Sequence, residues 1–281
     1  MLAVFSALSG GFANLFARRL VSVSQARNML SLNFGMMAAM LLPAAPWFFH
    51  LNLDSKSLIL LAGAIGLDGL ANYGYFRSFE RIEAVTASGL LAISPLFALG
   101  LSPLFLYQGL ILKSGQILAV GLFSFGIIMI LTGFRNRSLP LRSAPAKEFV
   151  FPIGTAFLFS ISMFFVRDLF LGNFLNPFTY YLIRAVIICA VSWMITKPDL
   201  GWVNPASLMM TAGRLVFVIG QWLFLLSALK TGHPAVVKAI ADLSPLVVVL
   251  FSWSLLREKP TLLQVAGMMA ILAGGSVLAL S

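Results

Sequence analysis

The stretches AVTASGLLAISPLFALGLSPLFL (residues 84–106) and PAVVKAIADLSPLVVVLFSWSL (residues 234–255) decide the fold of this chain. Both are long apolar runs, and the Ser-Pro-Leu at 94–96 in the first has a counterpart at 244–246 in the second, 150 positions later. About 20 apolar residues in a helix are enough to cross about 30 Å of hydrocarbon. The two runs therefore predict two membrane-spanning helices at equivalent places of a repeated structure.

Other positions repeat at nearly the same interval. Arg18, near the end of the first apolar run, corresponds to Arg167, 149 positions later, and Gly121 corresponds to Gly267 at an interval of 146. Apolar runs separated by charged, Gly, Pro or Asn clusters predict ten spans in all. Their ranges are 2–18, 26–49, 57–78, 84–106, 114–133, 149–167, 176–196, 207–228, 234–255 and 261–280.

These spans predict an all-α integral membrane protein made of two five-helix repeats. The repeats are 1–134 and 149–281, and a basic linker loop at 135–148 joins them. Because each repeat has an odd number of helices, the second one enters the membrane from the opposite side, so the repeats are inverted. Inverted repeats around a site at the membrane midplane are typical of carriers that work by alternating access. We therefore expect a central cavity between the two repeats.

The composition agrees with a bilayer as the solvent. Of the 281 residues, 60% are hydrophobic and only 10% are charged, against about 25% charged residues in soluble domains. The net charge of +10 would hint at nucleic acid in a soluble domain. Here the basic residues are spread over many predicted loops, which indicates topology signals and contacts with anionic lipid rather than a nucleic-acid partner.

No cofactor or metal is expected. Cys189 is the only cysteine of the chain, which excludes an intramolecular disulfide and any cysteine-cluster metal site. The sequence also has no GxSxG, P-loop or HExxH motif, so no catalytic residue is expected and the protein is predicted not to be an enzyme. Without ATP hydrolysis, transport would be downhill, exchange-driven or coupled to an ion.

The pattern resembles the EamA-like, ten-helix branch of the drug/metabolite transporter superfamily. The resemblance is carried by the five-plus-five spans, the basic pair that closes the first span, and Ser-Pro-Leu in the fourth and ninth. The segment Leu256-Arg257-Glu258-Lys259-Pro260, followed by Gln264-Val265-Ala266-Gly267, adds to it.

The resemblance implies a secondary carrier whose central cavity is lined by spans one to four and six to nine, with spans five and ten as buttresses. It also implies a multi-pass protein of the bacterial inner (plasma) membrane, with export as the usual direction. A monomer is expected, because two fused halves supply what a dimer supplies in shorter relatives. The resemblance favours cytoplasmic termini, whereas the distribution of Lys and Arg over the predicted loops favours the reverse orientation.

Five ionisable residues fall well inside the predicted spans: Asp68, Arg184, Arg214, Lys238 and Asp242. A charge at the centre of a membrane helix costs at least about 2.5 kcal/mol, so such residues are candidates for substrate binding. Structural alternatives exist for each. Lys238 and Asp242 are four residues apart and can pair with each other, the two arginines can snorkel, and Asp68 can pair with an unidentified cation.

Together these five residues carry an excess of one positive charge, which favours a carboxylate or phosphate group on the substrate. A zwitterion such as an amino acid would complement both signs. Asp68 and Asp242 are also candidates for proton coupling, because burial raises the pKa of a carboxyl group. If both acids are held in internal ion pairs, an anionic substrate becomes the better interpretation.

Polar and aromatic residues at middle depth extend the candidate substrate-binding set, although helix-to-helix hydrogen bonds or packing would explain them equally well. They are Asn72, Tyr73, Gln221 and Trp222, with Asn14, Asn33 and Tyr75 as further candidates. Pro95 and Pro245 each remove a backbone donor and should kink spans four and nine, acting as hinges or simply shaping the cavity.

The leading hypothesis is a secondary transporter, exporter or exchanger, of a small zwitterionic or anionic metabolite such as an amino acid. One alternative is a carrier of organic or phosphorylated anions, clamped by Arg184, Arg214 and Lys238. Another is a multidrug exporter, which would have a wider, aromatic-lined cavity. A membrane enzyme or assembly factor that acts on a lipid-linked substrate would instead have a lateral groove facing the lipid.

Overall fold

The computed structural model describes residues 1–106, 114–135, 146–230, 232 and 234–280. In these ranges the chain is helical, apart from connecting segments and one isolated antiparallel bridge between Leu51 and Leu175. Most of the predicted linker, 136–145, lies outside the described residues.

In its described residues, the first half contains seven α-helices and one short 3-10 turn at Leu42–Ala44. The helices are α1 (Leu2–Val21), α2 (Ala26–Leu41), α3 (Ala45–Phe48), α4 (Ser55–Arg81), α5 (Ala84–Leu91), α6 (Ser94–Leu106) and α7 (Ser114–Arg135).

The second half begins with a 3-10 turn at Ala146–Phe149 and includes a π-helical turn at Ser252–Leu256. Its α-helices are α8 (Val150–Leu171), α9 (Pro177–Thr196), α10 (Pro205–Leu229), α11 (Pro234–Ala241), α12 (Pro245–Phe251) and α13 (Leu262–Leu280).

Side-chain caps mark the starts of three long helices, α4, α9 and α10. Asp54 and Ser57 form a reciprocal capping box at the start of α4, and Asn204 and Ser207 form the same motif at the start of α10. Each box satisfies backbone N–H groups that have no partner inside the helix. Proline follows the cap directly in α9 and α10, where its missing N–H costs nothing.

Among the residues that the structure describes, eight helical stretches are long and apolar enough to cross a membrane, so the predicted count of ten is not confirmed. The 20-residue α1 is not among the eight; it carries Asn14, Arg18 and Arg19 among its apolar residues. The ninth predicted span is divided into α11, α12 and the π-helical turn, and only Pro245–Leu256 counts as a shorter apolar helix.

Two predicted spans are broken rather than kinked. The fourth is interrupted between α5 and α6, and the ninth between α11 and α12. Pro95 and Pro245 were expected in the middle of helices, but each lies in the first turn of a new helix. A proline there removes no intrahelical hydrogen bond, so in place of each predicted mid-helix kink the helix ends before the proline and a new one begins.

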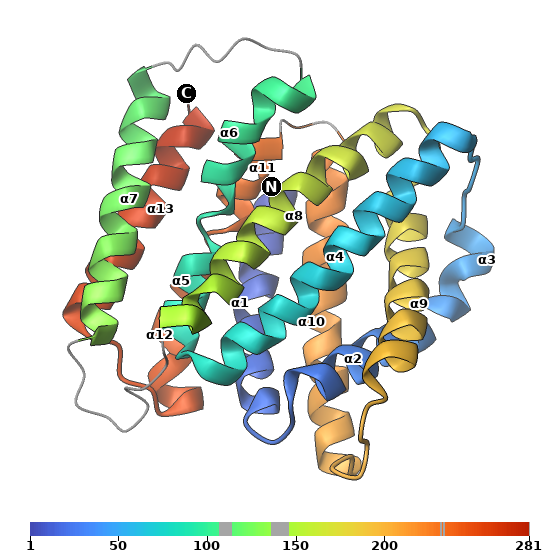
Figure 1. Cartoon of the computed structure of the whole chain (residues 1–281), viewed down its shortest axis with the longest axis horizontal. Helices are drawn as coiled ribbons and strands as arrows, with labels where there is room; N and C mark the ends of the chain where they lie inside the picture. Colours follow the sequence, from blue (N-terminus) through green and yellow to red (C-terminus); the bar gives the residue numbers. More distant parts are fainter. Residues whose placement is uncertain (107–113, 136–145, 231, 233, 281) are drawn as a thin grey trace.

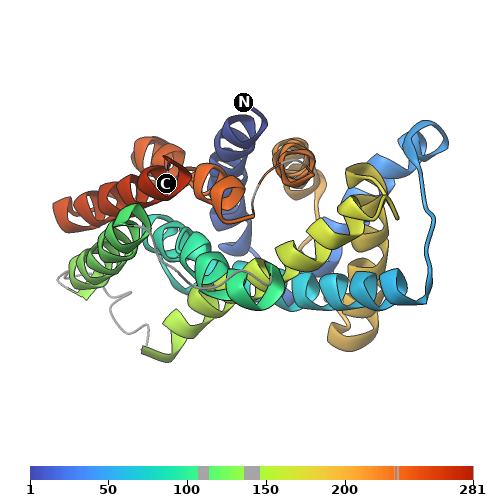
Figure 2. The same cartoon turned by 90° about the horizontal axis from the view of Figure 1, so that it is seen from above.

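The most extensive helix contacts join the two halves (Figures 1 and 2). Helix α7 packs along α13, α4 along α8, α1 along α10 and α2 along α9. The pair α7–α13 lies at one end of the molecule, and α2, α3 and α9 lie at the other. In the order of the predicted spans, these pairs are five with ten, three with six, one with eight and two with seven. If each span is replaced by its equivalent in the other half, the same four pairs result. A repeated structure requires this symmetry.

Glycines allow α7 and α13 to approach backbone to backbone. A Cβ atom on Gly126 would lie 2.5 Å from the carbonyl oxygen of Gly267, and one on Gly267 would lie 2.6 Å from that of Gly126. Small residues at such crossings let membrane helices pack closely. This pair therefore forms a tight unit beside the rest of the molecule.

Candidate functional site

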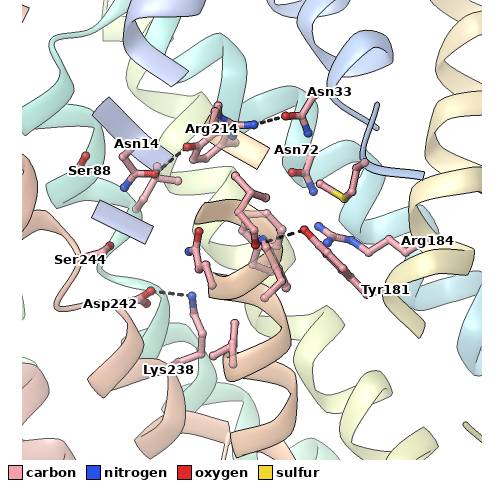
Figure 3. A pocket seen from close by; sticks show the side chains of 18 of the residues that line it. Asn14, Asn33, Asn72, Ser88, Tyr181, Arg184, Arg214, Lys238, Asp242 and Ser244 are labelled. Atoms are coloured by element: carbon pink, nitrogen blue, oxygen red, sulfur yellow. Dashed lines mark hydrogen bonds and ion pairs between the residues drawn. The ribbon is translucent and has the colours of Figure 1, made fainter. Parts of the chain in front are cut away.

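A central cavity lies between the halves (Figure 3). Its volume is about 70 Å³, enough for about five water molecules. Its walls come from α1, α2, α4, α5, α8, α9, α10, α11 and the segments between α5 and α6 and between α11 and α12, whereas no described residue of α7 or α13 contributes. This is the expected arrangement, with spans one to four and six to nine around the cavity.

Asp68 of α4 and Arg184 of α9 form a buried ion pair, with 2.8 Å between Oδ2 and Nε. The Tyr180 hydroxyl donates a hydrogen bond of 2.7 Å to the same carboxylate oxygen. Arg184 is therefore the cation that pairs with Asp68, which the sequence could not identify. Tyr180 lies one turn before Arg184 on α9, so a single helix face supplies both partners of the acid.

Aromatic rings enclose the Arg184 guanidinium. Its central carbon lies 4.0 Å from the ring centroid of Trp222, 5.3 Å from that of Tyr181 and 5.4 Å from that of Phe34. Such cation–π contacts are strong where water is excluded, and Arg184 is fully buried. Its two Nη atoms have no hydrogen-bond partner among the described residues, although the residue lines the cavity.

Arg214 of α10 is 3% exposed and lines the cavity. Its Nη1 donates to the side-chain oxygen of Asn33, and its guanidinium lies 5.0 Å from the ring centroid of Phe76 and 5.8 Å from that of Tyr75. No carboxylate among the described residues pairs with Arg214, and its buried Nε has no acceptor there. Arg214 is thus a buried cation held by neutral groups.

Lys238 and Asp242 pair at 2.7 Å across one turn, as their spacing allows. The Ser94 hydroxyl, from the first Ser-Pro-Leu motif, also donates to the Asp242 carboxylate. Because Ser94 begins α6, this carboxylate lies at the positive end of a helix dipole. The broken fourth and ninth spans therefore meet beside the cavity, where Asp242, Ser244 and Ala92 form part of the wall.

Three asparagines add mainly donors to the wall. Asn14 accepts a hydrogen bond of 2.7 Å from the Tyr75 hydroxyl, and Asn33 accepts one from Arg214. Both amide NH₂ groups thus remain available to a ligand. Asn72 is different, since its NH₂ donates at 2.7 Å to the backbone carbonyl of Asp68, leaving its oxygen as an acceptor.

Most of the predicted substrate-binding residues converge on this cavity, but two do not. Asn72, Arg184, Arg214, Gln221, Trp222, Lys238 and Asp242 line it, together with Asn14, Asn33 and Tyr75. Asp68 lies behind Arg184 and does not reach the wall. Tyr73 is 39% exposed and lines a different cavity, because it faces away from its neighbour Asn72 on α4.

Several residues of the cavity wall were not predicted from the sequence. Ser88, Phe159 and Tyr181 line the cavity, but nothing in their local sequence separates them from ordinary packing residues. Tyr181 could have been predicted, because it precedes Arg184 by three positions and so shares its helix face. Among the described residues, no cluster of three or more His, Cys, Asp or Glu side chains could hold a metal ion.

One end of the bundle is fastened by a polar cluster that joins the halves. Glu258 pairs with Arg18 of α1 at 2.8 Å and accepts a hydrogen bond of 2.9 Å from the backbone N–H of Ala84, at the start of α5. Arg18 also donates to the carbonyl of Phe79 on α4. Gln264 of α13 adds hydrogen bonds to the side chains of Glu83 and Thr86. Five segments are therefore tied together at this end.

The family model described as "EamA-like transporter family" matches residues 1–132 and again residues 147–280. No curated protein matches the chain. A solved structure titled only "Crystal structure of protein" is similar, with a TM-score of 0.64 and 13% sequence identity, and the match covers 98% of this chain and 97% of the other. At that identity the similarity concerns the fold alone.

Proposed function

Because the chain belongs to the EamA-like transporter family, we propose that it carries a small metabolite across the membrane, and that this metabolite has a net negative charge on carboxylate or phosphate groups. The substrate binds in the central cavity, and Arg214 is the residue that pairs with its negative charge. The observation that carries this proposal is that Arg214 is a cavity-lining cation, 3% exposed, with no carboxylate partner among the described residues.

The charges of the site support an anionic substrate. Asp68 neutralises Arg184 and Asp242 neutralises Lys238, so the excess positive charge of the five residues resides on Arg214. An isolated charge is costly in a water-poor interior, and a bound anion would offset that cost. Both acids are held in internal ion pairs and are not free to bind an ammonium group. This favours an anionic substrate over a zwitterion.

The hydrogen-bonding groups point the same way. The Nη atoms of Arg184 and the Nε of Arg214 are donors without acceptors among the described residues, and the NH₂ groups of Asn14 and Asn33 are available. Carboxylate and phosphate oxygens accept several hydrogen bonds at once and match a donor-rich wall. A cavity of about 70 Å³ also fits a small metabolite better than the wide site of a multidrug exporter.

An amino acid is the second candidate, and Asp242 is the observation that favours it. This carboxylate lines the cavity and is partly accessible, so an ammonium group could replace Lys238 as its partner while Arg214 holds the carboxylate. Asp242 is for the same reason the better proton-coupling candidate, because Asp68 does not reach the cavity wall.

Alternating access supplies the transport mechanism in this proposal. The two repeats, 1–134 and 149–281, are related by inversion, and the breaks before Pro95 and Pro245 act as hinges between half-helices. The Arg18–Glu258 ion pair joins the two halves at one end of the bundle, and in the proposed cycle it separates when that end opens. Export from the cytoplasm through a bacterial inner membrane is the direction and location that the family suggests.

Counterflow in proteoliposomes tests this function. Vesicles loaded with dicarboxylates, amino acids, sugar phosphates or a cationic drug are offered the labelled compound, with wild type beside Arg214→Gln. We expect saturable exchange of one anionic class, reduced at least about tenfold in the variant, since losing a charge-assisted hydrogen bond costs about 1.5–3 kcal/mol. Arg19→Gln is the matched control, because Arg19 is exposed in the last turn of α1, and it should exchange like wild type.

Exchange of cations alone would contradict the proposed substrate class. Undiminished exchange by a well-folded Arg214→Gln protein would contradict the role of Arg214 while leaving the transporter assignment intact. Exchange of amino acids but not of dicarboxylates, lost in Asp242→Asn, would favour the second candidate.

A further inference from the structure

A second cavity lies on the outer side of α2, α4 and α9 and shares no residue with the central one. Its volume is about 740 Å³, and aliphatic side chains form most of its lining. The lining residues are Arg27, Leu30, Ala62, Ile65, Gly66, Gly69, Leu70, Tyr73, Ile187, Ile188, Val191, Ser192, Ile195 and Thr196. We call this surface the α2–α4–α9 groove.

The groove is polar at one end and apolar at the other. The backbone N–H of Ala26, at the start of α2, donates at 3.2 Å to Glu80 near the end of α4. The N–H of Asp199, just after α9, donates at 3.1 Å to Asn28. These contacts place the start of α2 and the ends of α4 and α9 together. Arg27, Tyr73 and Thr196 therefore lie toward that end, and Ala62 and Ile187 lie toward the opposite one.

The length of the groove matches one leaflet. Nine residues of α9 separate Ile187 from Thr196, and eleven residues of α4 separate Ala62 from Tyr73. At 1.5 Å per residue these distances are about 13 and about 16 Å, close to half of the roughly 30 Å hydrocarbon thickness. The groove thus extends from one membrane surface to about the midplane.

Two glycines make the groove deep. A Cβ atom on Gly66 would have no heavy atom within 4 Å, and one on Gly69 would lie 3.7 Å from Ile188. Since α2, α4 and α9 are candidate membrane spans, this space faces the bilayer. The flexible acyl chains of the lipids are available there to fill an apolar hollow.

The charged groups at the polar end favour a negative headgroup. Arg27 is exposed and has no ion-pair partner among the described residues, and Lys197 is exposed directly after Thr196. The acids nearby are already engaged: Glu80 accepts from Arg77 and Ala26, and Asp199 accepts from the N–H of Gly201. Two free cations at a membrane surface attract anionic lipid.

From this placement we propose that the α2–α4–α9 groove binds one acyl chain of an anionic phospholipid whose phosphate pairs with Arg27. The site is a binding site rather than an enzyme site, since its lining has no Asp, Glu, His, Cys or Lys. The proposal does not depend on the substrate of the central cavity.

Native mass spectrometry of the detergent-purified chain tests the proposal with phosphatidylglycerol and phosphatidylcholine as the two probes. We expect wild type to retain one phosphatidylglycerol and to prefer it over phosphatidylcholine about fivefold, the contribution of roughly one cation near a lipid surface. Arg27→Gln should lose this preference, whereas Arg19→Gln should keep it. Gly66→Leu should lose the retained lipid, because its side chain fills the groove without meeting another atom at Cβ.

Gly121→Leu is the matched control for the groove, because Gly121 also has open space around its Cβ position but lies on α7. It should retain the lipid like wild type. Equal retention of both lipids by wild type, or an unchanged preference in Arg27→Gln, would overturn the headgroup assignment. Retention by Gly66→Leu equal to wild type, or equal loss in Gly66→Leu and Gly121→Leu, would overturn the groove as the binding site.

Discussion

At the scale of single residues, Asp68 and Arg184 pair although 116 positions separate them in the chain. The sequence identified both as costly charges inside spans, because a charge in hydrocarbon needs a reason to be there. Their partnership depends on how α4 and α9 face each other, which no local pattern reports. The Lys238–Asp242 pair, in contrast, follows from a spacing of four on one helix and was predictable.

The Asp68–Arg184 pair predicts a non-additive pattern of stability. Asp68→Asn should lower the free energy of unfolding by about 3–5 kcal/mol, because it leaves Arg184 as an unpaired buried charge. The double variant Asp68→Asn with Arg184→Gln should recover a large part of that loss. Thermal or denaturant unfolding in detergent, arranged as a double-mutant cycle, measures the difference. Asp168→Asn, an exposed acid on α8, is the control and should change little; additive single losses would contradict a specific pair.

At the scale of helices, hydropathy located nearly every apolar run. It did not show whether each run forms one continuous helix. The runs 84–106 and 234–255 read as single spans, yet both are broken beside the cavity. Hydropathy averages side chains over a window and carries no information on where the backbone stops being helical. Pro95 and Pro245 marked the region correctly, but a proline in mid-helix and one in a first turn look alike in sequence.

The contact between α7 and α13 predicts a strongly position-dependent effect of a single methyl group. Gly126→Ala should lower the unfolding free energy by about 1–3 kcal/mol, because the new Cβ overlaps the backbone carbonyl of Gly267 and the helices must separate. Gly121→Ala, on the same helix with no atom within 4 Å of the added Cβ, should be neutral or slightly stabilising. Thermal unfolding of both proteins in the same detergent measures the contrast, and equal effects would contradict the close approach.

At the scale of the whole molecule, the two repeats were recognisable in sequence but are interleaved in space. Each of the four most extensive helix pairs contains one helix from each half, and the Arg18–Glu258 ion pair joins the halves as well. Sequence periodicity reports that two segments are alike, but it does not say whether they pack within themselves or against each other. The interleaving therefore had to come from the structure.

This interleaving predicts that the halves depend on each other. Fragments 1–140 and 141–281, produced together, should co-purify in detergent and recover exchange activity in proteoliposomes. Either fragment alone should aggregate or be degraded, because its helices lack their main packing partners. Affinity purification through a tag on one fragment, followed by size-exclusion chromatography, checks this. A single fragment that elutes as a stable monomer would show that a half folds by itself.

The pairing of α1 with α10 and of α7 with α13 also bears on how the chain is made. During synthesis, α1 leaves the ribosome long before α10, and α7 leaves it long before α13. Some early helices carry polar residues, such as Asn14 and Arg18 of α1. Until their native partners are synthesised, these side chains need temporary hydrogen-bond partners in the lipid or beside the insertion machinery. The native packing of the first half therefore becomes possible only once the helices of the second half have been synthesised, not when each helix is inserted.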